Sequence, residues 1–323
     1  MVRPVRYFNP NGDSVTLSPV SSPSPPAAPS AYGPQGRSPW MDVDWRAHQH
    51  WTIINDSPVN VVELGEGPPV LFVHGLTGSW PNWLEQLPVF ARTHRVIALD
   101  LPGFGRSPMP KGDISISAYA RTLDALLDAL DLDAATLVGN SMGGFVAAEL
   151  AIAFPQRVER LVLVAPAGLS TYRDPRGLRE LRRIRRLEHP AAAITGWGAA
   201  HADTLARRPG LRDVALGLIV RHPDRLPAPL AAEQIRGGGK PGFIQALQAN
   251  LEYDFRHRVP EIACPTLIVW GADDPVITVR DADAYAELIP GSRSVILPDT
   301  GHMPQIERPT ELNALLAEFL GDS

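Results

Sequence analysis

The sequence has 323 residues, enough for one large domain or two small ones, and 44% of them are hydrophobic, so a sizeable core can form. A formal net charge of −5 gives no reason to expect nucleic acid as a partner, and the single cysteine, Cys264, excludes an internal disulfide framework and a cysteine-based zinc site. No apolar run reaches the roughly 18 residues that a membrane span needs, and no apolar signal-peptide segment follows Met1, so we expect a cytoplasmic protein.

Residues 1–40 differ in composition from the rest of the chain. The stretch from Ser18 to Pro29 is rich in proline and serine and nearly free of large apolar side chains, so burial cannot offset the entropy of ordering it. We therefore predict a disordered tail over residues 1–40. Met41 stands at the change in composition, which raises the hypothesis that translation starts there and that the first forty residues are a gene-model artefact.

Short apolar runs and helical spacings alternate along most of the remaining chain. The runs predict strands at residues 51–54, 60–64, 70–73, 95–99, 136–138, 161–164, 266–270 and 294–297. Leucines at helical spacing predict a helix over 123–130, a second helix covers 143–154, and an amphipathic pattern predicts a last helix over 312–319. Buried strands that alternate with helices indicate an α/β fold, with a mostly parallel sheet covered on both faces.

Residues 168–257 interrupt this alternation, because they hold helical patterns and several prolines but no clear buried strand. We predict a core of residues 41–167 and 258–323, with residues 168–257 inserted as a helical cap over the sheet edge. Seven arginines crowd the start of the insertion: Arg173, Arg176, Arg179, Arg182, Arg183, Arg185 and Arg186. They form either a solvated helix face or a patch for an anionic substrate or an acidic membrane surface.

The segment from Gly139 to Gly144 reads Gly-Asn-Ser-Met-Gly-Gly and fits the pattern G-x-S-x-G, with a predicted strand before it and a predicted helix after it. A serine in that context sits on a sharp, strained turn that lifts its hydroxyl out of the sheet, and bulk two residues before or after it would clash. We predict that Ser141 is a nucleophile. The backbone N–H of Met142, at the start of the helix, then points at the oxyanion that forms during acyl transfer.

Two further loops follow predicted strands. In His74-Gly75-Leu76, the backbone N–H of Leu76 is our candidate for the second oxyanion donor, whereas His74 is expected to brace the loop. The loop from Asp100 to Ser107 contains G-x-G, but Pro108 stands where a dinucleotide-binding loop needs its third glycine. We interpret that loop as a structural border of the pocket and not as a nucleotide site.

The candidate acid and base come late in the chain. Asp273 and Asp274 follow the strand at 266–270, and the carboxyl ends of parallel strands face the ligand crevice. A carboxylate there can hold a histidine in the tautomer that a general base needs, and either aspartate has that position. His302 follows the strand at 294–297 on a loop, residues 299–301, that we expect to be flexible.

These stretches together resemble the α/β-hydrolase superfamily, over about residues 51–167 and 258–320. In that family the acid stands three residues after the glycine of a W-G-x-x-D stretch, which implies Asp274, and a helical cap is often inserted before the acid strand. The Gly-Asn-Ser-Met-Gly-Gly form is similar both to bacterial esterases and lipases and to the hydrolases that cleave carbon–carbon bonds of ring-fission products. Serine at the nucleophile position argues against the dehalogenase and epoxide-hydrolase branches.

The residue after the catalytic histidine favours one of the two remaining branches. The carbon–carbon hydrolases tend to carry tryptophan there, whereas this chain has Met303. We therefore predict a serine-dependent hydrolase of small carboxylic esters, with the triad Ser141, His302 and Asp274 and no metal or organic cofactor. The alternatives are cleavage of a carbon–carbon bond, a perhydrolase side reaction of the same triad, and a small-molecule receptor on the same fold.

Overall fold

The computed structural model describes residues 32–172, 175, 178–179 and 196–321, together with the backbone of two short strands near the N-terminus. These two strands, β1 (Tyr7–Phe8) and β2 (Ser14–Val15), pair with each other in antiparallel orientation. The predicted disorder of residues 1–31 and six of the seven arginines at the start of the insertion lie outside the residues whose side chains are described, so both stay predictions. Within the described residues, no helix is both long and apolar enough to cross a bilayer.

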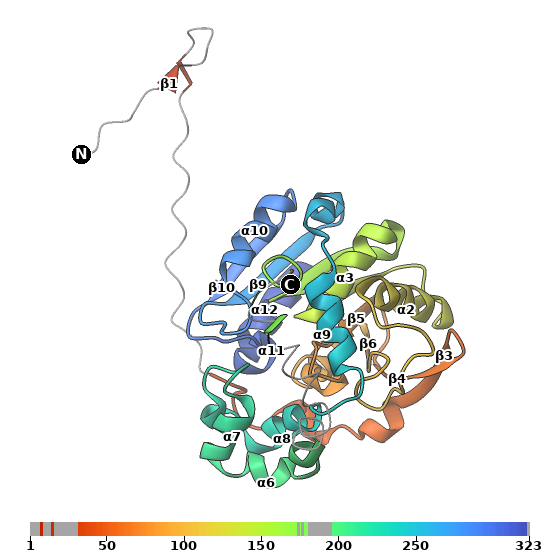
Figure 1. Cartoon of the computed structure of the whole chain (residues 1–323), viewed down its shortest axis with the longest axis vertical. Coiled ribbons are helices and arrows are strands. Elements are labelled where there is room, and N and C mark those ends of the chain that lie inside the picture. The colour runs from red at the N-terminus through yellow and green to blue at the C-terminus, as the bar shows by residue number, and fades with distance from the viewer. Residues whose placement is uncertain are drawn as a thin grey trace, which may run out of the picture.

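An eight-stranded sheet forms the centre of the molecule (Figure 1), in the order β10-β9-β8-β7-β5-β6-β4-β3. Its strands are β3 (Gln49–Ile54), β4 (Ser57–Leu64), β5 (Pro69–Val73), β6 (Arg95–Leu99), β7 (Ala135–Asn140), β8 (Val158–Val164), β9 (Thr266–Gly271) and β10 (Arg293–Leu297). The six strands β5 to β10 pair with one another in parallel. The antiparallel pairs of this sheet are β3 with β4 and β4 with β6. The predicted mostly parallel sheet is therefore confirmed.

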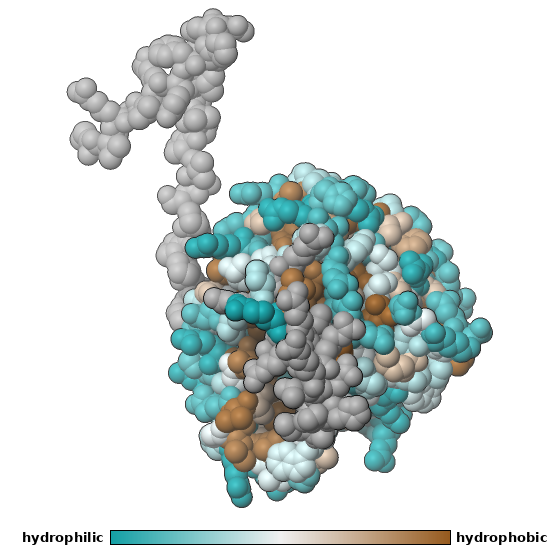
Figure 2. All heavy atoms as spheres, viewed as in Figure 1, coloured by the Kyte–Doolittle hydropathy of each residue, from teal (hydrophilic) through white to brown (hydrophobic). Residues whose placement is uncertain are grey.

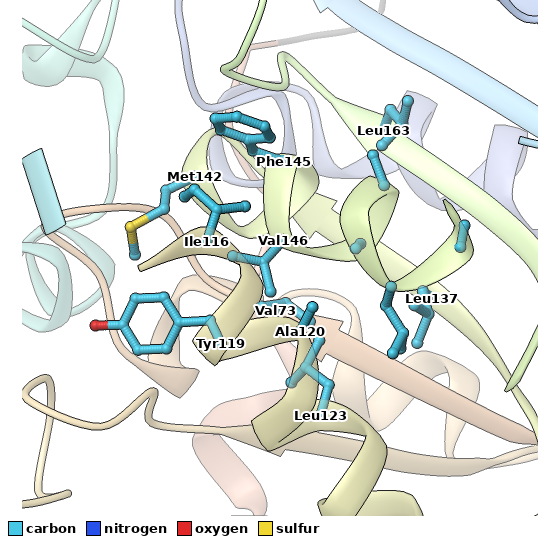
Figure 3. Packing of buried hydrophobic residues seen from close by; sticks show 14 of the residues in the cluster. Val73, Ile116, Tyr119, Ala120, Leu123, Leu137, Met142, Phe145, Val146 and Leu163 are labelled. Carbon is cyan, nitrogen blue, oxygen red and sulfur yellow. The ribbon is translucent and has the colours of Figure 1, made fainter. Parts of the chain in front are cut away.

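Helices cover both faces of the sheet, because alternate side chains of each strand point to opposite sides. Leu71 and Val73 of β5 face a cluster with α2 (Ile116–Ala129), α3 (Met142–Ala153) and α10 (Arg280–Leu288), whereas Val70 and Phe72 face a cluster with α1 (Leu87–Phe90), α11 (Pro304–Glu307) and α12 (Pro309–Leu320). Figure 3 shows part of the first cluster, in which side chains of α2 and α3 meet those of the sheet: Val73, Ile116, Tyr119, Ala120, Leu123, Leu137, Met142, Phe145, Val146 and Leu163.

The insertion between β8 and β9 is helical in the part of it that is described. Its helices are α6 (Ala202–Ala206), α7 (Pro209–Leu216), α8 (Ala228–Arg236) and α9 (Phe243–Glu252), with the 3-10 helices η5 (Pro223–Arg225) and η6 (Arg256–Glu261). Helices α6, α7 and α8 lie together at one end of the molecule, at the bottom of Figure 1. Figure 2 shows a largely hydrophilic described surface in the same view, with hydrophobic residues near α7, where Val214 and Leu218 are each 81% exposed.

The segment just before residue 41 differs from the expected tail, because residues 32–40 pack against the core. Ser38 is buried, and its hydroxyl donates to Glu85 Oε1 at 2.7 Å, as does the indole N–H of Trp40. The 3-10 helix η1 (Pro39–Asp42) runs through Met41 without a break. Composition failed at this boundary because prolines and serines continue to Pro39, whereas Tyr32, Ser38 and Trp40 among them donate to buried carboxylates. The start at Met41 stays a hypothesis.

Two more 3-10 helices lie near this segment. They are η2 (Trp45–His48), directly before β3, and η3 (Trp80–Trp83), directly after the loop that begins at His74. The rings of Trp45 and Trp80 are in contact, with their centroids 4.9 Å apart, so the residues before β3 are joined to the second face of the core. A further short 3-10 helix, η4 (Pro155–Arg157), links α3 to β8.

Candidate active site

Ser141 lies on the sharp turn between β7 and α3, with φ 56° and ψ −120°, a backbone conformation that side-chain-bearing residues rarely adopt. The turn is held by the Ser141 N–H, which donates to Val164 O at 3.0 Å, and by the N–H of Ala167, which donates to Ser141 O at 3.0 Å. A β-carbon on Gly143 would overlap the carbonyl oxygen of Val73. The predicted strand, strained turn and helix are therefore present.

His302 and Asp274 meet beside the ends of β10 and β9. The His302 Nδ1–H donates to Asp274 Oδ2 at 2.7 Å, and the two side chains are only 6% and 0% exposed. The other carboxylate oxygen, Asp274 Oδ1, accepts the N–H groups of Val276 and Ile277 at 2.8 and 2.9 Å. With Nδ1 protonated toward the carboxylate, Nε2 is left as the acceptor that a general base needs.

Asp273, the other candidate acid, has a different environment. Its side chain is 43% exposed, and its Oδ2 lies 4.0 Å from Arg221 Nε, at the limit of an ion pair. The backbone N–H of Asp273 donates to Thr300 O at 2.9 Å. The geometry thus places Asp274, and not Asp273, against His302.

The side chain of Asn140 joins the serine turn to the histidine. Its Nδ2 donates to Val164 O at 3.0 Å and to His302 O at 3.2 Å. Because Asn140 directly precedes Ser141, this amide holds the backbone of His302 beside the serine turn. The structure therefore bonds Asp274 to the ring of His302 and holds the His302 backbone beside the turn that carries Ser141, and these are the three residues that were predicted as a triad.

The two predicted oxyanion donors also lie at this turn. Met142 is the first residue of α3, where backbone N–H groups have no partner within the helix and the helix dipole favours negative charge. A β-carbon on Gly75 would come within 3.1 Å of Ser141 Cβ, so the peptide that leads to Leu76 packs directly on the nucleophile turn. Neither the Met142 N–H nor the Leu76 N–H donates to any acceptor in the described part of the chain.

His74 braces the loop after β5, as expected. Its Nδ1 hydrogen bonds Gly75 O at 2.7 Å, and its Nε2 accepts the N–H of Leu101 at 3.0 Å. Burial lowers the pKa of His74, so the ring stays neutral and keeps both bonds. In the neighbouring loop, Asp100 accepts the backbone N–H groups of Trp80 and Arg106, which agrees with a structural role for that loop.

Two residues near His302 were not singled out by the sequence. Glu307, on α11, accepts the backbone N–H groups of Gly301 and Met303 on either side of the histidine, and Tyr32 donates to the same carboxylate. The loop at 299–301, expected to be flexible, is therefore anchored. No sequence signal sets Glu307 apart, because Gln305 and Arg308 stand beside it, and nothing near Tyr32 in the chain points to this position.

Comparison with known proteins places these features in a family. A family model described as the alpha/beta hydrolase fold matches residues 68–309. The chain is 30% identical to 2-hydroxy-6-oxo-2,4-heptadienoate hydrolase of Pseudomonas putida, over 81% of this chain and 92% of that protein. Two solved structures are similar: Est816, described as an N-acyl homoserine lactone degrading enzyme (27% identity, TM-score 0.66, 84% of this chain, 100% of that one), and a membrane phospholipase A (26%, 0.67, 85% and 86%).

Proposed function

This chain belongs to the α/β-hydrolase family and is a hydrolase, and we propose that it cleaves carboxylic esters of small molecules with Ser141 as nucleophile. The observation that supports this most is the buried hydrogen bond of 2.7 Å between His302 and Asp274, beside a serine on a strained turn. That arrangement matches the nucleophile, base and orienting acid of two-step acyl transfer.

The proposed reaction has two steps. His302 Nε2 takes the hydroxyl proton of Ser141 while Oγ attacks the ester carbonyl carbon, and the negative oxygen of the tetrahedral intermediate accepts the N–H groups of Met142 and Leu76. His302 then gives the proton to the leaving alcohol. Water, deprotonated by His302, attacks the acyl-enzyme and releases the acid, while Asp274 stabilises the imidazolium in both steps.

Residues 168–257 act, in this proposal, as the cap that sets substrate choice. The described part of this segment contacts each loop around Ser141. Gln234 is hydrogen bonded to Asn82 beyond the His74 loop, and the N–H of Gly242 donates to Gly103 O. The N–H of His302 donates to Ile219 O at 3.0 Å. A cytoplasmic location is an expectation that comes from the sequence alone.

Cleavage of a carbon–carbon bond is the second candidate. It is favoured by the 30% identity to an enzyme named as a 2-hydroxy-6-oxo-2,4-heptadienoate hydrolase. An ester is favoured by Met303 after the histidine, and by two structural neighbours that are named for phospholipids and acyl homoserine lactones, both of which contain ester bonds. We place the ester first for these reasons.

The experiment is release of p-nitrophenol from acyl esters of increasing chain length, with the wild type beside Ser141→Ala. We expect turnover by the wild type and a loss on the order of 10³-fold or more in the variant, with an unchanged melting temperature. A vinylogous diketone is assayed in parallel. Equal ester turnover by both proteins would refute Ser141 as nucleophile, whereas turnover of the diketone alone would move the proposal to the carbon–carbon branch.

A further inference from the structure

The carboxylate of Glu307 fixes the backbone around His302. Glu307 is fully buried, its Oε2 accepts the N–H of Gly301 at 2.8 Å, and its Oε1 accepts the N–H of Met303 at 2.9 Å. These N–H groups belong to the two residues on either side of the histidine, and hydrogen bonds to a carboxylate are among the stronger ones in proteins. The orientation of the imidazole toward Ser141 thus depends on this carboxylate.

Two more donors reach the same carboxylate from distant parts of the chain. The backbone N–H of Arg221, in the segment after α7, donates to Glu307 Oε2 at 2.9 Å. The hydroxyl of Tyr32, which precedes the whole α/β core in sequence, donates to that oxygen at 2.6 Å and accepts the N–H of His222 at 2.9 Å. One hydroxyl therefore ties the catalytic loop to the inserted segment.

The position of Tyr32 is fixed by further contacts. The guanidinium carbon of Arg308 lies 5.1 Å from its ring centroid and that of Arg225 lies 5.8 Å away, both within the range of cation–π contacts. The N–H of Gly33 donates to Glu307 O at 2.7 Å. Burial, followed by the nearby charge of Glu307, raises the pKa of Tyr32 well above its usual range, so the hydroxyl remains a donor.

Asp299 repeats this arrangement at the other end of the loop. His222 Nε2 donates to Asp299 Oδ1 at 2.6 Å, and Arg308 Nη2 donates to Asp299 Oδ2 at 3.1 Å. The residues that contact the Tyr32 ring are thus also those that hold the start of the His302 loop. Both ends of the loop are thus bonded to residues that contact Tyr32.

We propose that Tyr32 is a positioning residue for His302, so that the segment before the α/β core forms part of the active-site architecture. This inference rests on the proposed role of His302 as the base. Without the hydroxyl, a buried carboxylate oxygen has one donor fewer and the His222 N–H has no acceptor, so the loop can shift relative to Ser141. Misplacement by a fraction of an ångström lowers kcat and leaves binding of the ground state nearly unchanged.

The test compares Tyr32→Phe with Ser38→Ala in the full chain. Each variant removes one hydroxyl that donates to a buried carboxylate, and both residues lie in the same segment, but Ser38 bonds Glu85 and not Glu307. We expect Tyr32→Phe to lower kcat for the ester by about tenfold with KM within about twofold of the wild type, and Ser38→Ala to leave kcat within about twofold. Equal kcat values for the two variants would overturn the proposal.

A spectroscopic readout keeps this inference separate from the choice of substrate. The Nδ1 proton of His302, bonded to Asp274, gives a downfield resonance in protein labelled with ¹⁵N-histidine, and Asp274→Asn identifies it by its loss. We expect this resonance to move or broaden in Tyr32→Phe and to stay in place in Ser38→Ala. If the wild type turns over no ester, the proposed function fails, and the resonance alone decides this inference: identical spectra for both variants would reject it.

Glu307→Gln provides a second variant should Tyr32→Phe fail to fold. The amide keeps one carbonyl acceptor for the same donors but lacks the charge, and its NH₂ group faces N–H groups that need an acceptor. We expect a loss of kcat larger than that of Tyr32→Phe with KM nearly unchanged. A Glu307→Gln protein with the kcat and the histidine resonance of the wild type would equally overturn the proposal.

Discussion

At the scale of single residues, the backbone conformation of Ser141 restricts the size of the side chains that can stand next to it in the turn. Its φ of 56° tightens the chain enough to bring Gly143 against the carbonyl oxygen of Val73. The strain, of order 1–3 kcal/mol, persists because hydrogen bonds to Val164 and Ala167 hold the turn from both sides. The glycines of the motif are thus a packing requirement of the strained serine.

The two adjacent aspartates offer a matched comparison. Asp274→Asn replaces a carboxylate that accepts from His302 with an amide whose NH₂ group favours the wrong tautomer of the imidazole, so we expect kcat to fall by about three to four orders of magnitude. Asp273→Asn alters a side chain that is 43% exposed and lies 4.0 Å from the exposed Arg221, so kcat should stay within about twofold. The measurement is kcat of both variants on the ester found for the wild type.

The reverse order of effects, with Asp273→Asn the more damaging, would show that the acid is misassigned. If both variants lose activity, their melting temperatures must be measured to separate a catalytic effect from unfolding, because Asp274 also accepts two backbone N–H groups. A fall in kcat that accompanies an unchanged melting temperature is the result that the proposed role requires.

The sequence could predict part of this site and not the rest. His302 and an aspartate were expected together because the ends of adjacent parallel strands, here β10 and β9, meet at one edge of the sheet. The choice of Asp274 came only from the family resemblance; its physical reason, two N–H groups that fix the carboxylate, is visible only in three dimensions. Tyr32 could not be predicted, since its bond to Glu307 spans 275 residues.

At the scale of elements, the strand, turn and helix around Ser141 form one packed unit. Gly143 lies on α3 and directly against the end of β5. We expect Gly143→Ala to lower the free energy of unfolding by about 3 kcal/mol or more, because the added methyl group must displace backbone and not a movable side chain. Urea denaturation of the purified variant measures this loss.

Gly210→Ala is the control for this substitution. Gly210 lies near the start of α7, and a β-carbon there meets no atom within 4 Å. Alanine is the better helix former, so the change should be neutral or stabilising by up to about 1 kcal/mol. Equal effects of the two substitutions would mean that the close approach of α3 to β5 is not the reason for glycine at position 143.

The limits of the strands show what apolar runs can and cannot indicate. The run at 95–99 coincides with β6 (Arg95–Leu99). The run at 136–138 is shorter than β7 (Ala135–Asn140), because Gly139 and Asn140 continue to pair with β8 without apolar side chains. The order of the strands follows from pairing between distant segments, and periodicity carries no information about it.

At the scale of the whole molecule, the segment of residues 32–40 forms hydrogen bonds with two parts of the core that are far apart in the sequence. Its residues bond Glu85 in the first half of the core and Glu307 near the C-terminus, and both carboxylates are buried. A buried carboxylate without its donors costs about 1–3 kcal/mol for each lost partner. The stability of the core is therefore expected to depend on a segment that composition assigned to the tail.

Chains that begin at residue 32 and at residue 41 can be compared with the full chain in thermal unfolding. The longer of the two keeps every hydrogen bond described for Tyr32, Ser38 and Trp40, so we expect it to unfold at the temperature of the full chain. The shorter one leaves Glu85 without two donors and Glu307 without two, one from the Tyr32 hydroxyl and one from the Gly33 N–H, so its melting temperature should fall by several degrees.

The intact mass of the native protein completes this comparison. A mass above that of a chain starting at Met41 is expected, because the two donors that the described residues supply to the buried Glu85 carboxylate, Ser38 and Trp40, both precede Met41. A native chain that starts at Met41 and melts at the temperature of the longer ones would show that these contacts contribute no stability. It would also remove Tyr32 from the native enzyme. The Glu307 carboxylate beside His302 would then keep three donors, the N–H groups of Gly301, Met303 and Arg221.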